Sequence, residues 1–322
     1  MSACVAICYN LSGYFNYTES YVELNHYIGF IVTGLFSLTA NVLLISLILN
    51  KEQLRKTYLL YSVLGVGDLS FGMAHLWSAI YRLSHYPPGV YRGLSPLTCA
   101  LKPFSLLYVV GLELPSLTML ALSCQRFLAV LKPLWYAEKW THGVSKFIAT
   151  VLVVSVTISC LLMPALSASR GNITVEPICR VVHAWGLAFS QFNNIFLILT
   201  TISFIVLNVS TITLYLRHRK QHALVHNFNW ITELRRFYAV LAVCLTSAVC
   251  FLIPHLLVGL YSWKWIGETS FYRYLMPTFY LSGLSSGINI IIYICLLKDF
   301  RKEALLTVRK SATVMTVRFR RS

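Results

Sequence analysis

Charge is what this sequence has least of. Charged residues make up only 12% of the 322-residue chain and hydrophobic residues 57%. An average soluble domain carries roughly 25% charged residues, and a soluble globule with so few could not cover its surface. Acidic residues are the scarcest, 11 against 27 Lys and Arg, for a net charge of +16. Nucleic-acid binding would need these cations gathered on a polar surface, but long apolar runs separate them. The composition predicts an integral membrane protein that does not bind nucleic acid.

Seven long intervals contain no Lys or Arg, and they predict the membrane spans. They have 23 to 36 residues, whereas a helix needs roughly 20 apolar residues to cross the bilayer. Asp68 and Glu113 are the only acidic residues inside them. The intervals are 24–50, 57–81, 103–125, 147–169, 181–216, 237–263 and 274–297, of which residues near 181–184 are expected to precede their helix. Barrel strands would alternate over about ten residues. The sequence therefore predicts an all-α membrane protein, a seven-transmembrane helix bundle.

The cations orient the predicted bundle in the membrane. A cytoplasmic C-terminus places 20 of the 27 Lys and Arg residues on the inner side, and the first 25 residues contain none. An excess of cations in cytoplasmic loops is the general rule for membrane proteins. We therefore expect a multi-pass plasma-membrane protein with its N-terminus outside. The start of the chain lacks a basic segment of the signal-peptide type, so the first helix is expected to serve as the targeting signal.

Glycosylation sequons agree with this orientation. Asn10, Asn16 and Asn172 begin sequons on predicted outer segments, whereas the sequon at Asn208 lies inside the fifth predicted helix, where no glycosyltransferase reaches. We divide the chain into an extracellular glycosylated segment (1–25), the seven-helix bundle (26–297), and an amphipathic helix with a basic cytoplasmic tail (298–322). In the last segment, basic and apolar residues alternate over 298–309, a pattern typical of a short eighth helix on the anionic inner leaflet or of a solvated basic tail.

Patterns of enzymes and metalloproteins are missing. The sequence shows no paired nucleophile and base, no glycine-rich phosphate loop and no metal-ligand spacing among its Cys and His residues. We therefore expect neither catalysis nor a bound cofactor, apart from a candidate sodium ion at Asp68.

Six short motifs lie in a fixed order on the predicted helices. They are ANV at 40–42, LGVGDL at 64–69, SCQRFLAV at 123–130, KPLWY at 132–136, NIIIY at 289–293 and FR at 300–301. Together they resemble the rhodopsin-like (class A) family of G-protein-coupled receptors, from about residue 25 to residue 306. The resemblance implies an extracellular small-molecule or peptide ligand and a heterotrimeric G protein as partners.

Several positions depart from the family pattern. Gln125 and Phe127 replace the acidic residue and the tyrosine around the third-helix arginine. Leu252 replaces the sixth-helix tryptophan two residues before Pro254, leaving Phe251 as a displaced aromatic, and Ile290 replaces a proline. The fourth helix has no tryptophan, the fifth no proline, and the spacing from Cys99 to Arg126 exceeds the family's by two residues, which Pro115 could absorb as a kink. Such erosion is similar to that of invertebrate chemosensory receptors, nematode serpentine types in particular, and of orphan receptors.

By this resemblance Arg126 packs inside the bundle at rest and is freed for the G protein when the sixth helix moves outward. The other parts of the implied switch are Gln125, Phe127, Pro254, Asn289 and Tyr293. Because Gln125 is neutral, we expect a weakened resting restraint and raised basal activity. The alternative for Arg126 is an arginine that snorkels at a helix end.

Asp68 is a carboxylate near the middle of a span, where an isolated charge is costly and must be neutralised or partnered. The resemblance implies a sodium and water pocket formed with Asn41, Ser285, Ser286 and Asn289. Pro115 occupies a neighbouring third-helix position, and a structural cluster around a protonated aspartic acid is the alternative to a sodium site.

Ligand contacts are expected near the outer ends of the helices. Tyr108 stands where amine receptors carry an aspartate, which argues against an amine ligand. His255, Phe279 and Tyr280 are the other expected lining residues. Glu113 has four readings: contact with a cationic ligand, a proton relay, a pair with His255, or a protonated acid bonded to a neighbouring helix. The resemblance also implies a disulfide between Cys99 and Cys179.

Two rival functions remain at this point. A small transporter or channel would use Asp68 and Glu113 as pathway carboxylates, although the internal repeat common in transporters is not evident. A receptor homologue that does not couple to a G protein is the other.

Overall fold

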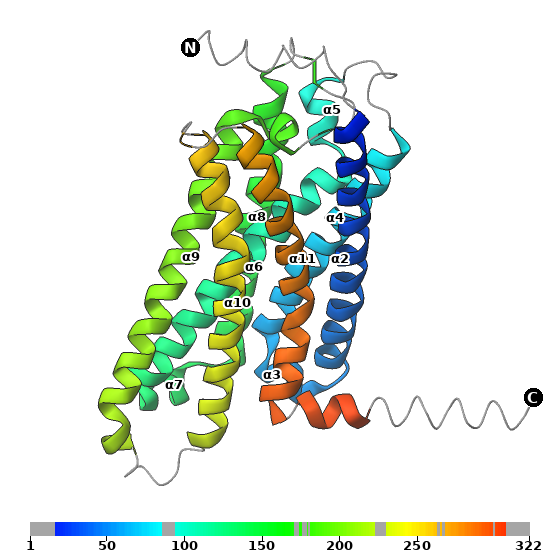
Figure 1. Cartoon of the computed structure of the whole chain (residues 1–322). Helices are drawn as coiled ribbons and strands as arrows, with labels where there is room; N and C mark the ends of the chain where they lie inside the picture. Colours follow the sequence, from blue (N-terminus) through cyan, green and yellow to red (C-terminus); the bar gives the residue numbers. More distant parts are fainter. Residues whose placement is uncertain are drawn as a thin grey trace, which may run out of the picture.

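Seven long helices run side by side as a bundle (Figure 1). The computed structural model describes residues 17–85, 94–170, 174–175, 179, 181–222, 230–262, 265, 268–298 and 300–306. The long helices are α2 (Tyr17–Leu49), α4 (Leu59–Ser84), α6 (Pro103–Leu131), α8 (His142–Ala168), α9 (Val181–His222), α10 (Trp230–Ser262) and α11 (Glu268–Leu296). Within the described residues, each contains a stretch of 19 to 30 residues that is long and apolar enough to cross a membrane. The predicted seven-helix fold is confirmed.

Short helices lie at both ends of the bundle. α3 (Glu52–Thr57), α7 (Pro133–Lys139) and the helical residues 300–306 lie at one end, and α5 (Pro96–Ala100) at the other (Figure 1). We call these the α7 end and the disulfide end. In the segment 300–306 the Phe300 side chain is buried, whereas Arg301 and Lys302 are exposed. The predicted short helix after the seventh span is therefore present.

Prolines mark where α5 and α6 begin. Pro96 and Pro103 each occupy the first turn, where the missing N–H costs nothing because it would have no helical partner. Ser95 caps α5 by accepting a hydrogen bond from the Thr98 amide at 3.1 Å. Cys99 thus lies in a separate short helix, and the chain breaks before α6. This break takes up the long spacing to Arg126, and α6 continues as a helix through Pro115.

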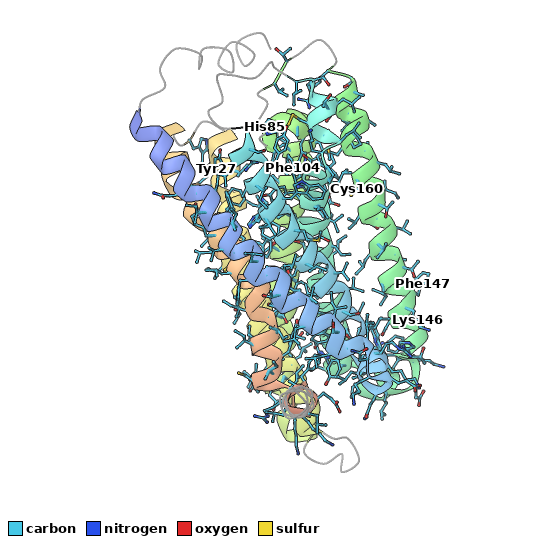
Figure 2. All side chains as sticks on the ribbon, turned by 90° about the vertical axis from the view of Figure 1, so that its right-hand side faces the viewer. Tyr27, His85, Phe104, Lys146, Phe147 and Cys160 are labelled. Atoms are coloured by element: carbon cyan, nitrogen blue, oxygen red, sulfur yellow. A yellow bond between two sulfur atoms is a disulfide. The ribbon has the colours of Figure 1, made fainter. Side chains whose placement is uncertain are left out.

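α4 and α6 form the centre of the bundle and α8 its margin. In the most apolar stretch of α4 and of α6, 67% of the residues are buried inside the protein, against 17% for α8. Figure 2 shows α8, with Lys146, Phe147 and Cys160, at the edge of the molecule. Most of the α8 surface is therefore left to lipid.

Two glycines allow α4 and α6 to approach closely. A Cβ added to Gly111 would lie 2.6 Å from the backbone N and Cα of Phe71, and one added to Gly67 would lie 2.5 Å from Cδ of Pro115. Such distances are far below van der Waals contact, so no larger residue fits without moving a helix. The contact sets the position of α6 against the face of α4 that carries Asp68.

The disulfide end is tied together covalently and by hydrogen bonds. Cys99 and Cys179 form a disulfide, as the family resemblance implied, with 5.3 Å between their Cα atoms. α9 bends at Gly186, whose φ of 74° favours glycine. The Arg170 guanidinium packs on this glycine and donates to the Ala184 carbonyl at 3.1 Å. The spanning part of α9 is Ala188–Arg217, which confirms that residues 181–184 precede the span.

We expect Gly111→Ala to destabilise the bundle by about 1–3 kcal/mol, the usual cost of overpacking, because the new methyl group meets the backbone of Phe71. Thermal unfolding of the purified protein in detergent measures this loss. Gly143→Ala is the matched control, since its Cβ would meet only the Thr141 hydroxyl at 3.5 Å. Equal melting temperatures for the two variants would show that the approach of α4 and α6 is not as close as described.

Candidate functional site

Arg126 lies in the last turns of α6, at the α7 end, and its side chain is only 5% exposed. Its Nη2 donates to the Tyr61 hydroxyl of α4 at 3.4 Å. The neighbouring Gln125 donates from Nε2 to the Tyr136 hydroxyl of α7 at 2.8 Å. Phe127 is half-buried. The two polar residues of this predicted switch therefore bond to different helices.

Four aromatic rings pack together beside Arg126. Tyr61 meets the edge of Tyr293 at 5.0 Å between centroids, and Tyr58 meets Phe300 at 4.9 Å. Tyr58 and Tyr61 are themselves in edge contact at 5.3 Å. The sequence prediction included Tyr293 but missed both α4 tyrosines. Their spacing of three residues, with Tyr61 seven before Asp68, places them on one helix face and could have revealed them.

Asp68 is the centre of a buried polar cluster formed by α2, α4 and α11. Asn289 donates from Nδ2 to Asp68 Oδ2 at 2.7 Å. The Asp68 carbonyl accepts from the Ser37 hydroxyl at 3.0 Å and from Ser286 at 3.2 Å. Asn41 joins by donating to the Ser286 carbonyl at 3.1 Å. Three of the four predicted partners therefore surround Asp68, together with one that the prediction missed, Ser37.

Ser285 takes a different direction, because its hydroxyl donates to the Ser282 carbonyl within its own helix at 2.9 Å. The oxygens near Asp68 nonetheless suit a hard cation, which prefers oxygen ligands. Oδ1 of Asn41 and Oδ1 of Asn289 are buried and accept no hydrogen bond in the described part of the chain. The carboxylate of Asp68 and these two amide oxygens are therefore the groups that would hold a sodium ion.

A second polar cluster joins α6, α9 and α10. Asn208 donates from Nδ2 to the Ser123 hydroxyl at 2.8 Å, and Ser123 lies 3.7 Å from the Cys244 sulfur. Asn208 is buried, so its sequon is unusable, as the sequence indicated. Sequence reasoning did not assign this asparagine a structural role, although a polar residue inside a span is itself a signal.

Glu113 is buried against α8 and is 2% exposed. Its carboxyl group is within hydrogen-bonding reach of Ser159, and the other oxygen, Oε1, has no hydrogen-bond partner among the described residues. His255 bonds through Nδ1 to the Asn194 side chain of α9 at 2.9 Å. A pair between Glu113 and His255 is therefore not formed, and Glu113 fits the reading of an acid bonded to a neighbouring helix.

The expected ligand residues face three different neighbours. The Tyr108 hydroxyl lies 3.0 Å from that of Ser78 on α4. His255 turns to α9. Phe279 and Tyr280 pack in an apolar cluster with Phe30 of α2, and the Tyr280 hydroxyl hydrogen-bonds His26. Sequence position thus indicated the correct end of the bundle but not the direction of each side chain.

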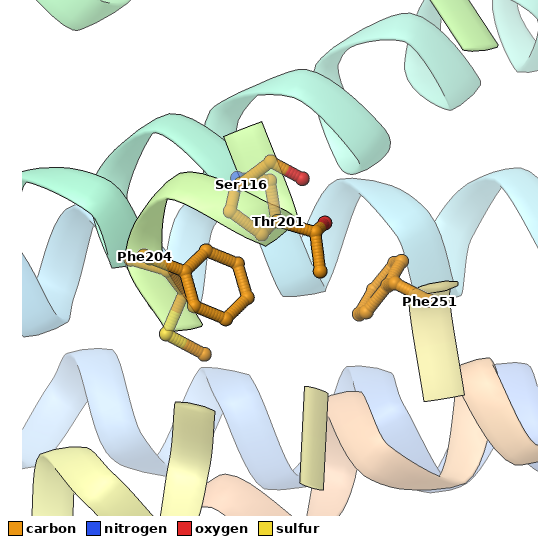
Figure 3. A pocket seen from close by; sticks show the side chains of 6 residues that line it. Ser116, Thr201, Phe204 and Phe251 are labelled. Atoms are coloured by element: carbon orange, nitrogen blue, oxygen red, sulfur yellow. The ribbon is translucent and has the colours of Figure 1, made fainter. Parts of the chain in front are cut away.

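A small cavity lies between α6, α9 and α10 (Figure 3). Its lining residues are Pro115, Ser116, Met119, Thr201, Phe204 and Phe251. The space open to the centre of a water molecule is about 10 Å³, room for roughly one water. Phe251, the displaced aromatic of the sixth helix, therefore faces the core beside a water-sized void.

Comparison with known families places this arrangement. Residues 40–293 match the family model for the 7 transmembrane receptor (rhodopsin family), which covers most of the bundle and contains the residues around Asp68 and Arg126. The chain belongs to the rhodopsin-like receptor family. No curated protein sequence matches it. The rhodopsin-like family consists of G-protein-coupled receptors and is in general non-enzymatic.

As a rhodopsin-like receptor, the chain carries its unusual residues within the matched region. Gln125, Leu252 and Ile290 all lie between residues 40 and 293. Within the residues the structure describes, no group of three His, Cys, Asp or Glu side chains is placed to hold a metal ion. The glycosylation predictions at Asn10, Asn16 and Asn172 fall outside the described residues.

We expect Asp68→Ala to lower the free energy of unfolding by about 1–3 kcal/mol, because the buried Asn289 amide loses its acceptor. Asp68→Asn retains an acceptor oxygen and should cost less. Ser285→Ala is the control, since its hydroxyl bonds only within α11 in the described contacts. Thermal unfolding in detergent ranks the three variants, and an unchanged melting temperature for Asp68→Ala would contradict the cluster.

Proposed function

We propose that this rhodopsin-like receptor binds an extracellular ligand and activates a heterotrimeric G protein at the plasma membrane. Its disulfide end faces outward and its α7 end faces the cytoplasm. Two observations support this orientation: the excess of cations on the α7 side, and the disulfide, which persists in an oxidising compartment. In this orientation residues 1–25 are extracellular and glycosylated at Asn10 and Asn16, Asn172 is glycosylated on an outer loop, and 298–322 form a membrane-surface helix and basic tail.

The observation that carries the proposal is the surface around Arg126. The arginine is buried at the end of α6, and α7 follows directly with Leu134 76% exposed and Trp135 46% exposed. Apolar side chains this exposed next to the membrane suit docking by a partner protein. Arg126 and α7 therefore supply the buried charge and the apolar surface of a G-protein contact.

Activation is a population shift between a resting and an active bundle, driven by a ligand that binds the active one more tightly. The inner end of α10 contacts α6 through Cys244 and Ser123, at 3.7 Å, one turn before Arg126. An outward movement of α10 separates these groups and opens space beside Arg126. Pro254 within α10 and the void beside Phe251 give this helix room to move.

The ligand is a small organic molecule or part of a peptide. Tyr108 and His255 are the proposed polar contacts, with Phe279 and Tyr280 nearer α2. Both polar groups are uncharged or weakly charged and each already has a neutral partner, Ser78 and Asn194 respectively. Such surroundings favour a neutral or weakly polar ligand over a strongly cationic one.

A transporter is the second candidate, and the geometry speaks against it. Its pathway carboxylates would be Asp68 and Glu113, but Asp68 faces α2 and α11 whereas Glu113 faces α8. They contact opposite sides of the α4–α6 pair and line no common path among the described residues. A non-coupling homologue is distinguished by experiment.

We expect Arg126→Ala to abolish G-protein nucleotide exchange, and Leu134→Ala to lower it about ten-fold or more, as for an apolar residue central to an interface. The measurement is nucleotide exchange on membranes from cells expressing each variant at equal surface density. Leu161→Ala is the matched control, because Leu161 is also exposed, at 68%, but lies on α8 within the span. Exchange that persists in Arg126→Ala would contradict receptor coupling, and its absence from the parent chain with every ligand tried would favour the non-coupling homologue.

We expect sodium chloride, replacing choline chloride at equal ionic strength, to raise the melting temperature of the purified receptor. At a concentration ten times the Kd the gain is about 1.4 kcal/mol. Asp68→Asn should abolish the difference between the two salts because it removes the charge that holds the ion. A salt difference that survives in Asp68→Asn would place the ion elsewhere.

A further inference from the structure

The restraint on Arg126 in this receptor cannot come from the residue before it. Gln125 is neutral, and its amide is engaged with the Tyr136 hydroxyl at 2.8 Å. The Arg126 guanidinium is nevertheless buried, and a buried cation needs hydrogen-bond acceptors. The Tyr61 hydroxyl supplies one, at 3.4 Å from Nη2.

Tyr61 is held firmly in place. Its side chain is 1% exposed, and its ring is in edge contact with Tyr58 on one side and Tyr293 on the other. Edge-to-face aromatic pairs fix ring orientation and contribute beyond their buried area. The position of the Tyr61 hydroxyl therefore depends on α11, which carries Tyr293.

The same aromatic group extends to the helical segment 300–306. Phe300 contacts Tyr58 at 4.9 Å and Tyr293 at 5.8 Å. Glu303 in this segment forms an ion pair with Lys51, at 3.0 Å, just before α3. A chain of contacts thus runs from the segment after the seventh span, through two tyrosine rings, to the hydroxyl that accepts from Arg126.

We propose that Tyr61 is a positioning residue that keeps Arg126 inside the resting bundle, and that its stacking on Tyr293 makes this restraint sensitive to movement of α11. The inference rests on the proposed function, in which Arg126 contacts the G protein after release. A neutral hydroxyl holds a guanidinium less strongly than a carboxylate does. The latch is therefore weak, and the receptor samples its active state without ligand.

The test removes the hydroxyl and keeps the ring. In Tyr61→Phe the aromatic contacts remain, and only the acceptor for Arg126 is lost. We expect basal nucleotide exchange to rise about five-fold, the ratio that one hydrogen bond of ordinary net strength contributes to an equilibrium. Tyr238→Phe is the matched control, because Tyr238 lies on α10 with 48% of its surface exposed. Melting temperatures of both variants show that each is folded.

A second readout needs no G protein. Cys244 is buried between α10 and α6, 3.7 Å from the Ser123 hydroxyl and 3.8 Å from the Met119 sulfur. Its alkylation by a small maleimide, quantified on the Cys244 peptide by mass spectrometry, reports separation of these helices. We expect Tyr61→Phe to raise this rate about five-fold while the exposed Cys295 reacts equally in all variants.

Double variants separate positioning from general loosening. Gln125→Asp added to Tyr61→Phe should return the Cys244 rate toward the parent value, because it supplies a carboxylate beside Arg126. In an Arg126→Ala background, Tyr61→Phe should have no further effect, since the latch then has nothing to hold. An effect of equal size in that background would overturn the proposal.

The two readouts distinguish the two hypotheses. A raised Cys244 rate without nucleotide exchange in any variant supports the latch and contradicts coupling. An unchanged Cys244 rate in a folded Tyr61→Phe receptor overturns the latch, whatever the exchange assay gives.

Discussion

A polar group inside the hydrocarbon layer has to find its partner within the protein, and the interior of this receptor is organised by that constraint. Asp68, Arg126, Glu113 and Asn208 are each buried, and each bonds to a helix other than its own: α11, α4, α8 and α6. The apolar residues of α8 need no such partners, and α8 lies at the margin. Polar pairing therefore decides which helices are central, and apolar packing fills the space between them.

The sequence was sufficient for the number of spans and for their approximate ends, because crossing the bilayer fixes the length of each apolar run. It was sufficient for most of the Asp68 cluster, because Asn41, Ser286 and Asn289 are marked by family motifs. It failed where the rotation of a helix decides the outcome. Ser285 and Ser286 are adjacent, yet only Ser286 turns toward Asp68, and Glu113 turns away from His255. Tyr61 was missed because its importance arises from two residues far along the chain, Arg126 and Tyr293, and no local pattern encodes that meeting.

The departures from the family pattern become understandable once their surroundings are known. A glutamine before Arg126 still makes a hydrogen bond, but directs it to α7 through Tyr136, and so links α7 to the end of α6. The loss of the sixth-helix tryptophan leaves Phe251 against a void that the side chains of α6 and α9 complete (Figure 3). Both exchanges replace a strong or bulky group by a weaker or smaller one. We infer that this receptor separates its resting and active states by less free energy than a chain with the full motifs would.

Pro115 has a consequence for the stiffness of α6. A proline has no N–H, so it cannot donate to the carbonyl of Gly111 four residues earlier, and the helix loses one rung of its hydrogen-bond ladder there. Gly111 and Pro115 are both pressed against α4, by Phe71 and Gly67 respectively. The weakest rung of α6 is therefore also its most tightly clamped part. The clamp acts as a fulcrum: a small tilt of the segment carrying Tyr108 on one side becomes an opposite displacement of the segment carrying Arg126 on the other, without bending α4.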